Sequence, residues 1–161
     1  MAIWYGRGSR MAFLLLYRAG RQSIPAEGGR AMLGVMPDSR IPAIKVILLP
    51  KDTNALGTIF GGVILSHIDL ASAVEARKVA RRRYVTKAMR EVEFHEPVFL
   101  GDIVNFFTET VRVGRTSITV KVTVEAERWG GGEGERVMVT QAEVVLVAVD
   151  ESGRPTPIRE G

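Results

Sequence analysis

Between Gly61 and Ala71, the first half of a predicted helix that extends to residue 83, Asp69 is the one carboxylate among side chains that are almost all apolar or small. A helix that is apolar on nearly every side is typical of a protein interior. An ionised carboxylate is costly there unless a specific partner holds it. The positions three and four residues away provide no cation: Leu65, Ser66, Ser72 and Ala73. Asp69 is therefore either a hydrogen-bonded structural residue or a carboxylate retained for chemistry.

One strand before this helix and four strands after it are predicted to position the carboxylate. The first strand covers residues 44 to 49 and ends at Pro50, and a polar turn at 52–54 leads to the glycine pair Gly61 and Gly62 at the helix start. The later strands are expected at 84–94, 103–113, 117–127 and 137–149. Apolar and polar residues alternate strictly in the third of these, as in a half-buried antiparallel strand. We predict an α+β fold in which an antiparallel sheet of about five strands wraps around one long central helix and buries its faces.

The composition of the chain excludes several classes of site. With 161 residues the chain is long enough for one domain with a real core. It contains no cysteine, which excludes disulfides, thiolate catalysis and zinc–thiolate sites, and its two histidines leave little material for a metal site. No apolar run has the length needed to span a bilayer. We therefore expect no metal, no cofactor and no membrane insertion.

The net charge of +4 is unevenly distributed along the chain. Residues 1–40 carry six arginines against two acidic residues, whereas residues 41–161 carry 16 basic and 16 acidic residues. A domain without an overall basic field lacks the footprint of a nucleic-acid binder, so we expect no nucleic-acid partner. This division predicts an N-terminal extension over 1–40 and a folded domain over 41–161. The extension is interpreted as poorly ordered or as sequence ahead of a true start at Met32 or Met36, with a targeting segment as the alternative.

Six short motifs follow one another in a fixed order between residues 41 and 160. They are Leu49 to Asn54, Ile59 to Gly62, Ile68 to Ala71, Pro97 to Asp102, Val113 to Ile118 and Val147 to Pro155. Each motif alone is weak, but the ordered series resembles the hotdog-fold acyl-CoA thioesterases, specifically their YciA-like bacterial branch. Residues 1–40 have no counterpart in that resemblance.

The resemblance implies hydrolysis of acyl-CoA thioesters to free CoA and a carboxylic acid in the cytoplasm. It also implies a homodimer as the minimal unit, commonly a homohexamer built as a trimer of dimers, with active sites between protomers. The family's functional pair matches Asn54 and Asp69 of this chain, which are expected to meet across the subunit interface. Without the resemblance, Asn54 would be interpreted as a turn residue.

Thioester hydrolysis gives Asp69 and the glycine pair defined tasks. Asp69 can act as a general base on water or attack directly to form an anhydride, and the sequence does not separate these routes. The free backbone amides at the helix start can polarise the thioester oxygen, a role assigned to Gly62 more than to Gly61. The alternative is a glycine pair selected only for packing.

A second group of residues is expected to bind the phosphates of CoA. Arg115, Thr116 and Ser117 follow Gly114 in a tight turn, and such turns can form anion-binding nests. Arg82 and Arg83 at the expected helix end provide further positive charge. For each of these residues a solvated surface position is the alternative.

The two histidines are not expected to join Asp69. His67 is two residues away, which places it about 200° around the helix, so the two side chains do not share a face. His95 ends a predicted strand beside Pro97 and is expected at the surface. The family often has an aromatic residue where this chain has Val63, a difference that bears on pocket width and on the preferred acyl chain.

Two other functions fit the same fold. A non-catalytic hotdog module would bind acyl-CoA or lipid and act through a partner, with the basic extension as a docking segment. A hotdog hydratase or dehydratase would require an aspartate and a histidine that converge on the substrate, and neither histidine stands in a clear position for that. The pair Asn54 and Asp69 favours the thioesterase over both.

Overall fold

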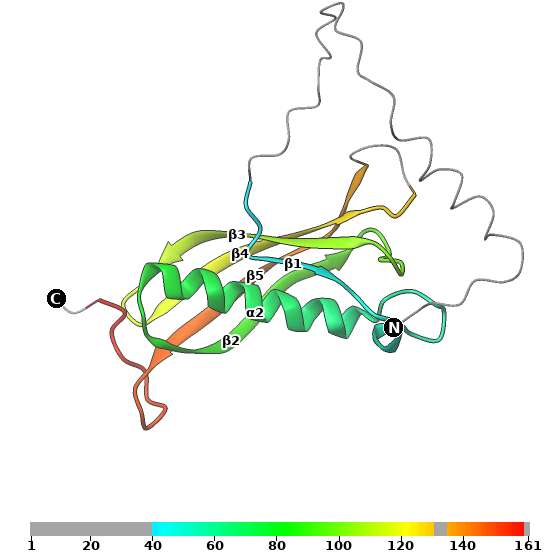
Figure 1. The fold of residues 1–161 in the computed structure, drawn as a ribbon. Coiled ribbons are helices and arrows are strands. Elements are labelled where there is room, and N and C mark those ends of the chain that lie inside the picture. The colour runs from blue at the N-terminus through cyan, green and yellow to red at the C-terminus, as the bar shows by residue number, and fades with distance from the viewer. Residues whose placement is uncertain (1–39, 131–134, 160–161) are drawn as a thin grey trace, which may run out of the picture. The chain divides into compact units, whose positions relative to one another are not determined.

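The computed structural model describes residues 40–130 and 135–159, so the predictions made for residues 1–39 lie outside the described residues. Its elements are β1 (Ile44–Ile47), a short 3-10 turn η1 (Pro50–Asp52), α2 (Gly61–Val79), β2 (Arg83–Phe94), β3 (Ile103–Val113), β4 (Ser117–Glu127) and β5 (Arg136–Val149). One long helix packs against a five-stranded sheet (Figure 1), which confirms the predicted α+β class.

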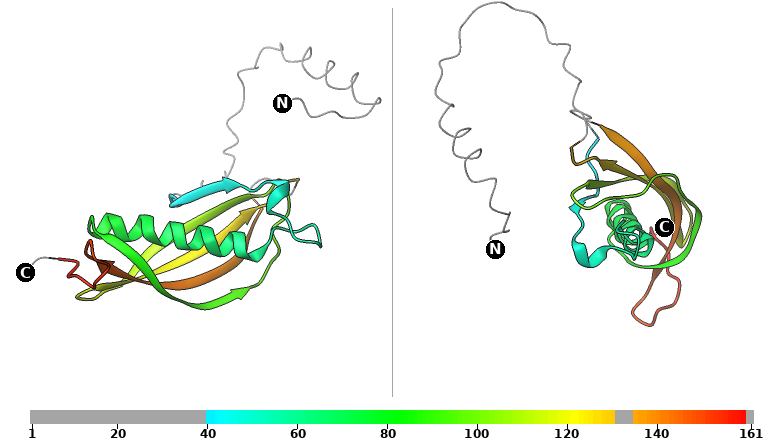
Figure 2. Two further views of the ribbon diagram at one scale, coloured as in Figure 1. Left: turned by 90° about the horizontal axis from the view of Figure 1, so that it is seen from below. Right: turned by 90° about the vertical axis from the view of Figure 1, so that its right-hand side faces the viewer.

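The sheet has the strand order β1-β3-β4-β5-β2, and every neighbouring pair is antiparallel. Seen along the helix, the sheet curves around α2, with β1 and β2 as its two edge strands (Figure 2). β1 is short and pairs only with residues 103–106 of β3. Residues 107–113 of β3 therefore have no strand on that side within the described part of the chain.

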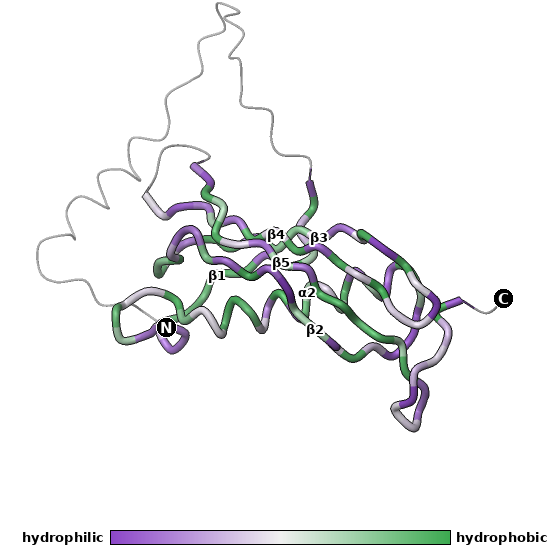
Figure 3. The backbone as a smooth tube through the Cα atoms, turned by 180° about the vertical axis from the view of Figure 1, so that it is seen from behind, coloured by the Kyte–Doolittle hydropathy of each residue, from purple (hydrophilic) through white to green (hydrophobic). Residues whose placement is uncertain are grey.

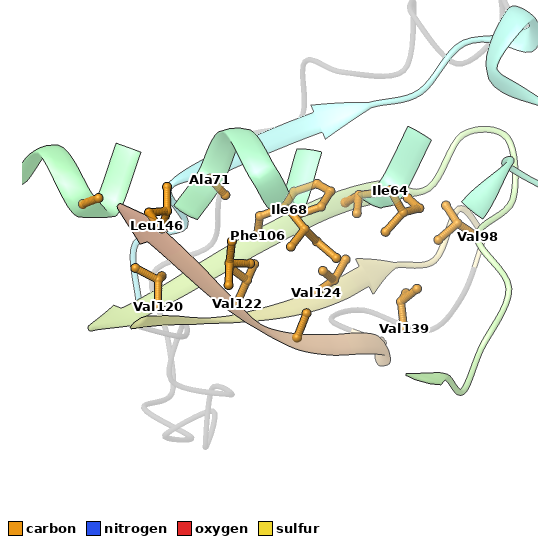
Figure 4. Close-up of a cluster of buried hydrophobic side chains, with 14 of the residues drawn as sticks. Ile64, Ile68, Ala71, Val98, Phe106, Val120, Val122, Val124, Val139 and Leu146 are labelled. Carbon is orange, nitrogen blue, oxygen red and sulfur yellow. The ribbon is translucent and has the colours of Figure 1, made fainter. Parts of the chain in front are cut away.

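The core forms between the helix and the concave face of the sheet. In β4, fully buried residues alternate with partly exposed ones along the whole strand, as the sequence pattern predicted. Figure 4 shows apolar side chains of α2 facing those of β3, β4 and β5. The buried cluster includes Ile64, Ile68, Ala71, Phe106, Val120, Val122, Val124 and Leu146. Apolar burial of this extent is the main force that fixes α2 on the sheet.

The expectation that the sheet buries every face of the helix is wrong for the single protomer. Ser66, Leu70 and Val74, which follow one another at four-residue spacing, form a stripe that the sheet does not cover. Leu70 is 56% exposed and Val74 is 42% exposed. Figure 3 shows that apolar and polar segments alternate along the backbone of α2. The curvature of five strands is enough to enclose only part of the helix circumference.

The helix ends earlier than the sequence predicted. Val79 is its last residue, and Ala80 takes an extended conformation with φ −154°. Arg83 already belongs to β2, because it pairs with Val149 of β5. The arginines at 81–83 therefore follow the helix rather than form its last turn. Within the described residues, no helix combines the length and hydropathy needed to cross a membrane.

Candidate active site

Asp69 lies near the middle of α2, on the flank of the helix that faces β2. The hydroxyl of Thr86 in β2 donates a hydrogen bond to Asp69 Oδ1. Next to this threonine, β2 has a register shift between Thr86 and Ala88, and such bulges redirect the side chains around them. Asp69 is half-buried. The predicted carboxylate therefore has a specific partner, Thr86, which the sequence pattern did not reveal.

Asn54 lies in the loop before α2, where its side chain closes a turn. Its amide nitrogen donates to Thr58 Oγ1 at 2.8 Å, and its Oδ1 accepts from the backbone amides of Leu56 at 2.8 Å and Thr58 at 3.3 Å. The turn role is thus present. Within one protomer no hydrogen bond joins Asn54 to Asp69 in the described residues, so their expected meeting across an interface stays a prediction.

The start of α2 offers free backbone donors. Phe60, the residue before the helix, provides no capping hydrogen bond, and the first turn holds no acidic residue. The amide of Val63 donates to the Phe60 carbonyl at 2.9 Å, whereas the amides of Gly61 and Gly62 have no backbone acceptor within the described residues. Free amides at the positive end of the helix dipole attract negative charge. This arrangement fits the predicted polarisation of a carbonyl oxygen.

A cavity of about 340 Å³ lies beside this helix start. It is lined by Ile59, Gly61, Ile64, Phe94, His95, Glu96, Pro97, Val98 and Val139. His95 is exposed, as expected, but it also belongs to the rim of this cavity. The sequence pattern did not reveal the cavity, because its walls come from separate segments: the entry to α2 and its first turn, the end of β2 with the loop after it, and the start of β5. Figure 4 shows Ile64, Val98 and Val139 at that end of the core.

An ion pair between the buried Asp102 and the partly buried Arg128 holds the wall of this cavity in place. Arg128 donates to Asp102 Oδ2 at 2.7 Å and to the Pro97 carbonyl at 2.8 Å. The next residue, Val98, accepts a hydrogen bond at 2.9 Å from the amide of Ile59, which lies just before the helix start. The ion pair at the end of β4 therefore fixes the loop of residues 95–102 between β2 and β3, called the wall loop below. The wall loop in turn contacts the segment that leads into α2.

The predicted phosphate-binding residues gather at the opposite end of the helix. Arg115 and Arg82 both contact Ile158, through a 2.9 Å hydrogen bond from the Ile158 amide to the Arg115 carbonyl and a 3.4 Å bond from Arg82 Nε to the Ile158 carbonyl. Thr116 and Ser117 complete the turn between β3 and β4, where Gly114 donates to the Ser117 carbonyl at 2.7 Å.

A surface hollow of about 390 Å³ adjoins these residues. It is lined by Arg77, Arg81, Arg82 and Arg83, and Arg83 also pairs with Glu151 at 3.3 Å. The 19 residues of α2 separate this basic end from Gly61 by about 28 Å. One protomer thus carries the glycine pair and the arginines at distant ends of the same helix.

His67 points away from Asp69, as its helical position predicted. Its Nδ1 lies 2.9 Å from the Val63 carbonyl, and its ring stacks on Phe106 of β3 with 5.5 Å between ring centroids. The described residues contain no cluster of three metal-ligating side chains.

Comparisons with known proteins agree with this architecture. Residues 56–130 match the family model of the thioesterase superfamily. An acyl-CoA thioester hydrolase of Haemophilus influenzae, described as uncharacterized, is 38% identical over 133 residues, or 82% of each chain. The acyl-CoA thioester hydrolase YciA of Salmonella typhimurium is 35% identical over 71% of this chain and 87% of its own length.

Among solved structures, Cj0915 of Campylobacter jejuni, described as a hexameric hotdog fold thioesterase, matches with 46% identity and a TM-score of 0.69. The match covers 73% of this chain and 90% of Cj0915. The long helix and the curved sheet described above are consistent with the hotdog fold named for Cj0915, and the sequence matches indicate the same family. The chain therefore belongs to the thioesterase superfamily and, within it, to the hotdog-fold acyl-CoA thioester hydrolases of the YciA-like branch.

Proposed function

We propose that this protein hydrolyses acyl-CoA thioesters to free CoA and a carboxylic acid, with Asp69 as the catalytic carboxylate. The observation that carries the proposal is the placement of Asp69: it is oriented by Thr86 on a half-buried flank of α2. The names of the relatives support the reaction, since YciA is called an acyl-CoA thioester hydrolase.

In the reaction, an oxygen nucleophile adds to the thioester carbonyl while negative charge develops on the carbonyl oxygen. The free amide of Gly62, assisted by Gly61, stabilises that charge at the helix start. The C–S bond then breaks and the CoA sulfur leaves as a thiol after it takes up a proton. Asp69 either removes a proton from the attacking water or forms an anhydride that water opens. A single turnover in ¹⁸O-labelled water distinguishes the routes, because only the anhydride route can place label in the Asp69 carboxylate.

A second protomer completes the site in this proposal. The stripe of Ser66, Leu70 and Val74, and the position of β2 as an edge strand of the sheet formed by the described residues, support a homodimer in which the helices lie side by side. Asn54 of the neighbouring protomer then assists Asp69 at the interface. The hexameric description of Cj0915 supports a homohexamer as the full assembly.

An antiparallel arrangement of the two helices would bring the basic end of one protomer near the glycine pair of the other. The CoA phosphates then bind Arg82, Arg83 and the turn of Arg115, Thr116 and Ser117. Residues 41–161 form the catalytic domain in this proposal, and residues 1–40 take no part in the chemistry. A cytoplasmic location follows from the family resemblance alone.

The test is release of free thiol from a series of acyl-CoAs by the full-length protein. Asp69→Ala is expected to lower kcat/KM by a factor of about 10² to 10⁴. The control is Glu109→Gln, which neutralises an exposed acid on β3 and should leave kcat/KM unchanged. Turnover of no acyl-CoA by the wild type, or full turnover by Asp69→Ala, would reject the proposal.

Mixed oligomers test the shared site directly. Asn54→Ala and Asp69→Ala protomers, each inactive alone, are co-expressed with different tags and purified together. If each site takes Asn54 from one protomer and Asp69 from the other, every mixed dimer keeps one intact site. Intact sites are then half of the sites in mixed dimers and about a quarter of all sites after random pairing. If both residues act within one protomer, the mixture stays inactive.

A further inference from the structure

We propose that Phe94 determines the length of acyl chain that the enzyme accepts, and that the substrates are uncharged straight acyl groups of short to medium length. This inference rests on the proposed hydrolysis and deepens it. It arises from the Phe94 ring, which stands where a side chain at Gly61, the first residue of α2, would touch it, together with the apolar cavity that both residues line.

The backbone of Phe94 is held by hydrogen bonds to β5, whereas its side chain is partly exposed and could contact a ligand. Its backbone pairs with Thr140 of β5, and on either side the Glu93 carbonyl accepts from Thr140 Oγ1 at 2.7 Å and the His95 amide donates to the Val139 carbonyl at 2.9 Å. The residue is nevertheless 45% exposed. Truncation of the ring should therefore change the cavity without removing core packing.

The ring stands directly beside the proposed carbonyl-binding amides. A Cβ at Gly61 would lie 3.4 Å from Phe94 Cζ, in van der Waals contact with the ring. Glycine leaves this space empty, so a substrate carbonyl at the helix start has the Phe94 ring as its neighbour. A chain that runs from that carbonyl into the cavity must pass the ring. Phe94 is therefore placed to limit the chain, whereas Val63, the departure from the family noted in the sequence, is not among the residues that line the cavity.

The walls of the cavity define the chemical class of the chain. Ile64, Val98 and Val139 are buried apolar residues, with exposures of 1%, 3% and 0%, and they form its inner wall. A volume of about 340 Å³ stands at the lower end of the range for small-molecule pockets. Contact with an apolar wall makes binding more favourable with each added methylene. A terminal carboxylate would bind unfavourably, because it would lose its hydration without gaining a partner. A short, uncharged acyl chain fits these conditions.

The experiment measures kcat/KM of the full-length protein for straight-chain acyl-CoAs from acetyl to palmitoyl, and for succinyl-CoA against butyryl-CoA. For the wild type, kcat/KM should rise about fourfold per methylene while the chain fits, then level off or fall, and butyryl-CoA should be preferred to succinyl-CoA. Phe94→Ala should raise the ratio of dodecanoyl to butyryl turnover by about tenfold or more, because the lost ring makes room for further methylenes. Phe94→Trp should lower the same ratio.

The matched control is Leu100→Ala, which truncates an apolar side chain of nearly the same exposure (44%, against 45% for Phe94) on the wall loop but outside the cavity lining. It should leave the chain-length profile unchanged. Equal effects of Phe94→Ala on all chain lengths, an equal shift in Leu100→Ala, or a preference for succinyl-CoA would overturn the inference.

Failure of the proposed hydrolysis would have a different signature. In that case the wild type releases no thiol from any acyl-CoA, and titration calorimetry of the same acyl-CoA series tests Phe94 by binding. A shift of the preferred chain length for binding in Phe94→Ala would support the role of the ring without hydrolysis. Affinities that do not depend on chain length in either protein would reject it.

Discussion

Helix α2 carries two carboxylates on different flanks, Asp69 toward β2 and Glu75 toward β3, and their surroundings differ. Glu75 Oε2 accepts from Thr108 at 3.0 Å and from Lys78 at 2.9 Å, and its Oε1 accepts from Thr110 at 3.1 Å. Both oxygens of Glu75 are therefore occupied. Asp69 accepts one hydrogen bond, from Thr86 to Oδ1, and its Oδ2 accepts none within the described residues.

The comparison separates a carboxylate that holds the fold from one that can act on a substrate. Burial raises the pKa of Glu75, but the hydrogen bonds from Lys78, Thr108 and Thr110 and the charge of Lys78 outweigh it, so the pKa lies below its ordinary value. A carboxylate saturated in this way is stabilised as an acceptor and has no oxygen free for a proton from water. Asp69 is oriented by one partner and keeps an open oxygen, which is the condition for a general base or nucleophile.

The largest difference between the two acids should appear when each is converted to its amide. Asp69→Asn should lower kcat by a factor of about 10² to 10⁴ with little effect on the unfolding midpoint in urea. Glu75→Gln should leave kcat near that of the wild type at a temperature where the variant is folded. Equal losses of kcat in both variants would show that Asp69 and Glu75 do not differ in their role in catalysis.

For stability the order of the two variants should be reversed, with the larger loss in Glu75→Gln. Glu75→Gln weakens three hydrogen bonds to a charged acceptor that is mostly shielded by the protein, and should lower the free energy of unfolding by about 1–3 kcal/mol. Urea unfolding with the slope held constant measures the change. The matched variant Thr108→Val removes one donor and should cost less than Glu75→Gln, and a stability equal to the wild type in both would show that the cluster is not structural.

Thr86 distinguishes orientation of the acid from mere packing. Thr86→Val keeps the shape but removes the donor, and should lower kcat by about tenfold, the equivalent of one lost hydrogen bond. Thr86→Ser restores the hydroxyl and should recover most of kcat. The pH profile of kcat should change in the valine variant and return in the serine variant. Equal kcat values for the valine and serine variants would assign the effect to packing.

The smallest effect concerns the pH dependence of stability. Because the pKa of Glu75 is lowered from its ordinary value of 4.5, its contribution is fully present above pH 4.5 and is lost as the pH falls through the lower, folded-state pKa. The gap in unfolding free energy between the wild type and Glu75→Gln should therefore narrow in that acidic window. A gap that is constant from neutral pH down to this window would contradict the assignment.

The fold could be predicted from the sequence where a pattern is local. The alternation of apolar and polar residues along β4 predicted which side of the strand is buried. The position of Asp69 in an apolar part of the helix identified it as a candidate catalytic carboxylate. Thr86 and Phe94 could not be found in this way, because their roles depend on contacts with α2 that a bulge and the curvature of the sheet create. Glu75 looks like an ordinary helix-surface residue next to Lys78 until β3 supplies the two hydroxyl donors.

The early end of α2 and its uncovered stripe have the same origin. Residues 80–83 have no turn signal as strong as glycine or proline, so only the pairing of Arg83 with Val149 decides that the chain has become a strand. Likewise, the apolar character of Leu70 and Val74 indicates burial but does not say by what. The sequence records that a surface is apolar, whereas the partner that covers it lies elsewhere in the chain or in another protomer.

The short first strand has a consequence for self-association. Beyond Phe106, β3 presents backbone donors and acceptors on the side where β1 has ended, and no strand of the described chain pairs with them there. Such an edge can pair with a strand of another molecule. The register shift between Thr110 and Arg112 twists this row, and Arg112 places a charge on it. Removal of these two features would be expected to turn the outer half of β3 into a site of edge-to-edge aggregation.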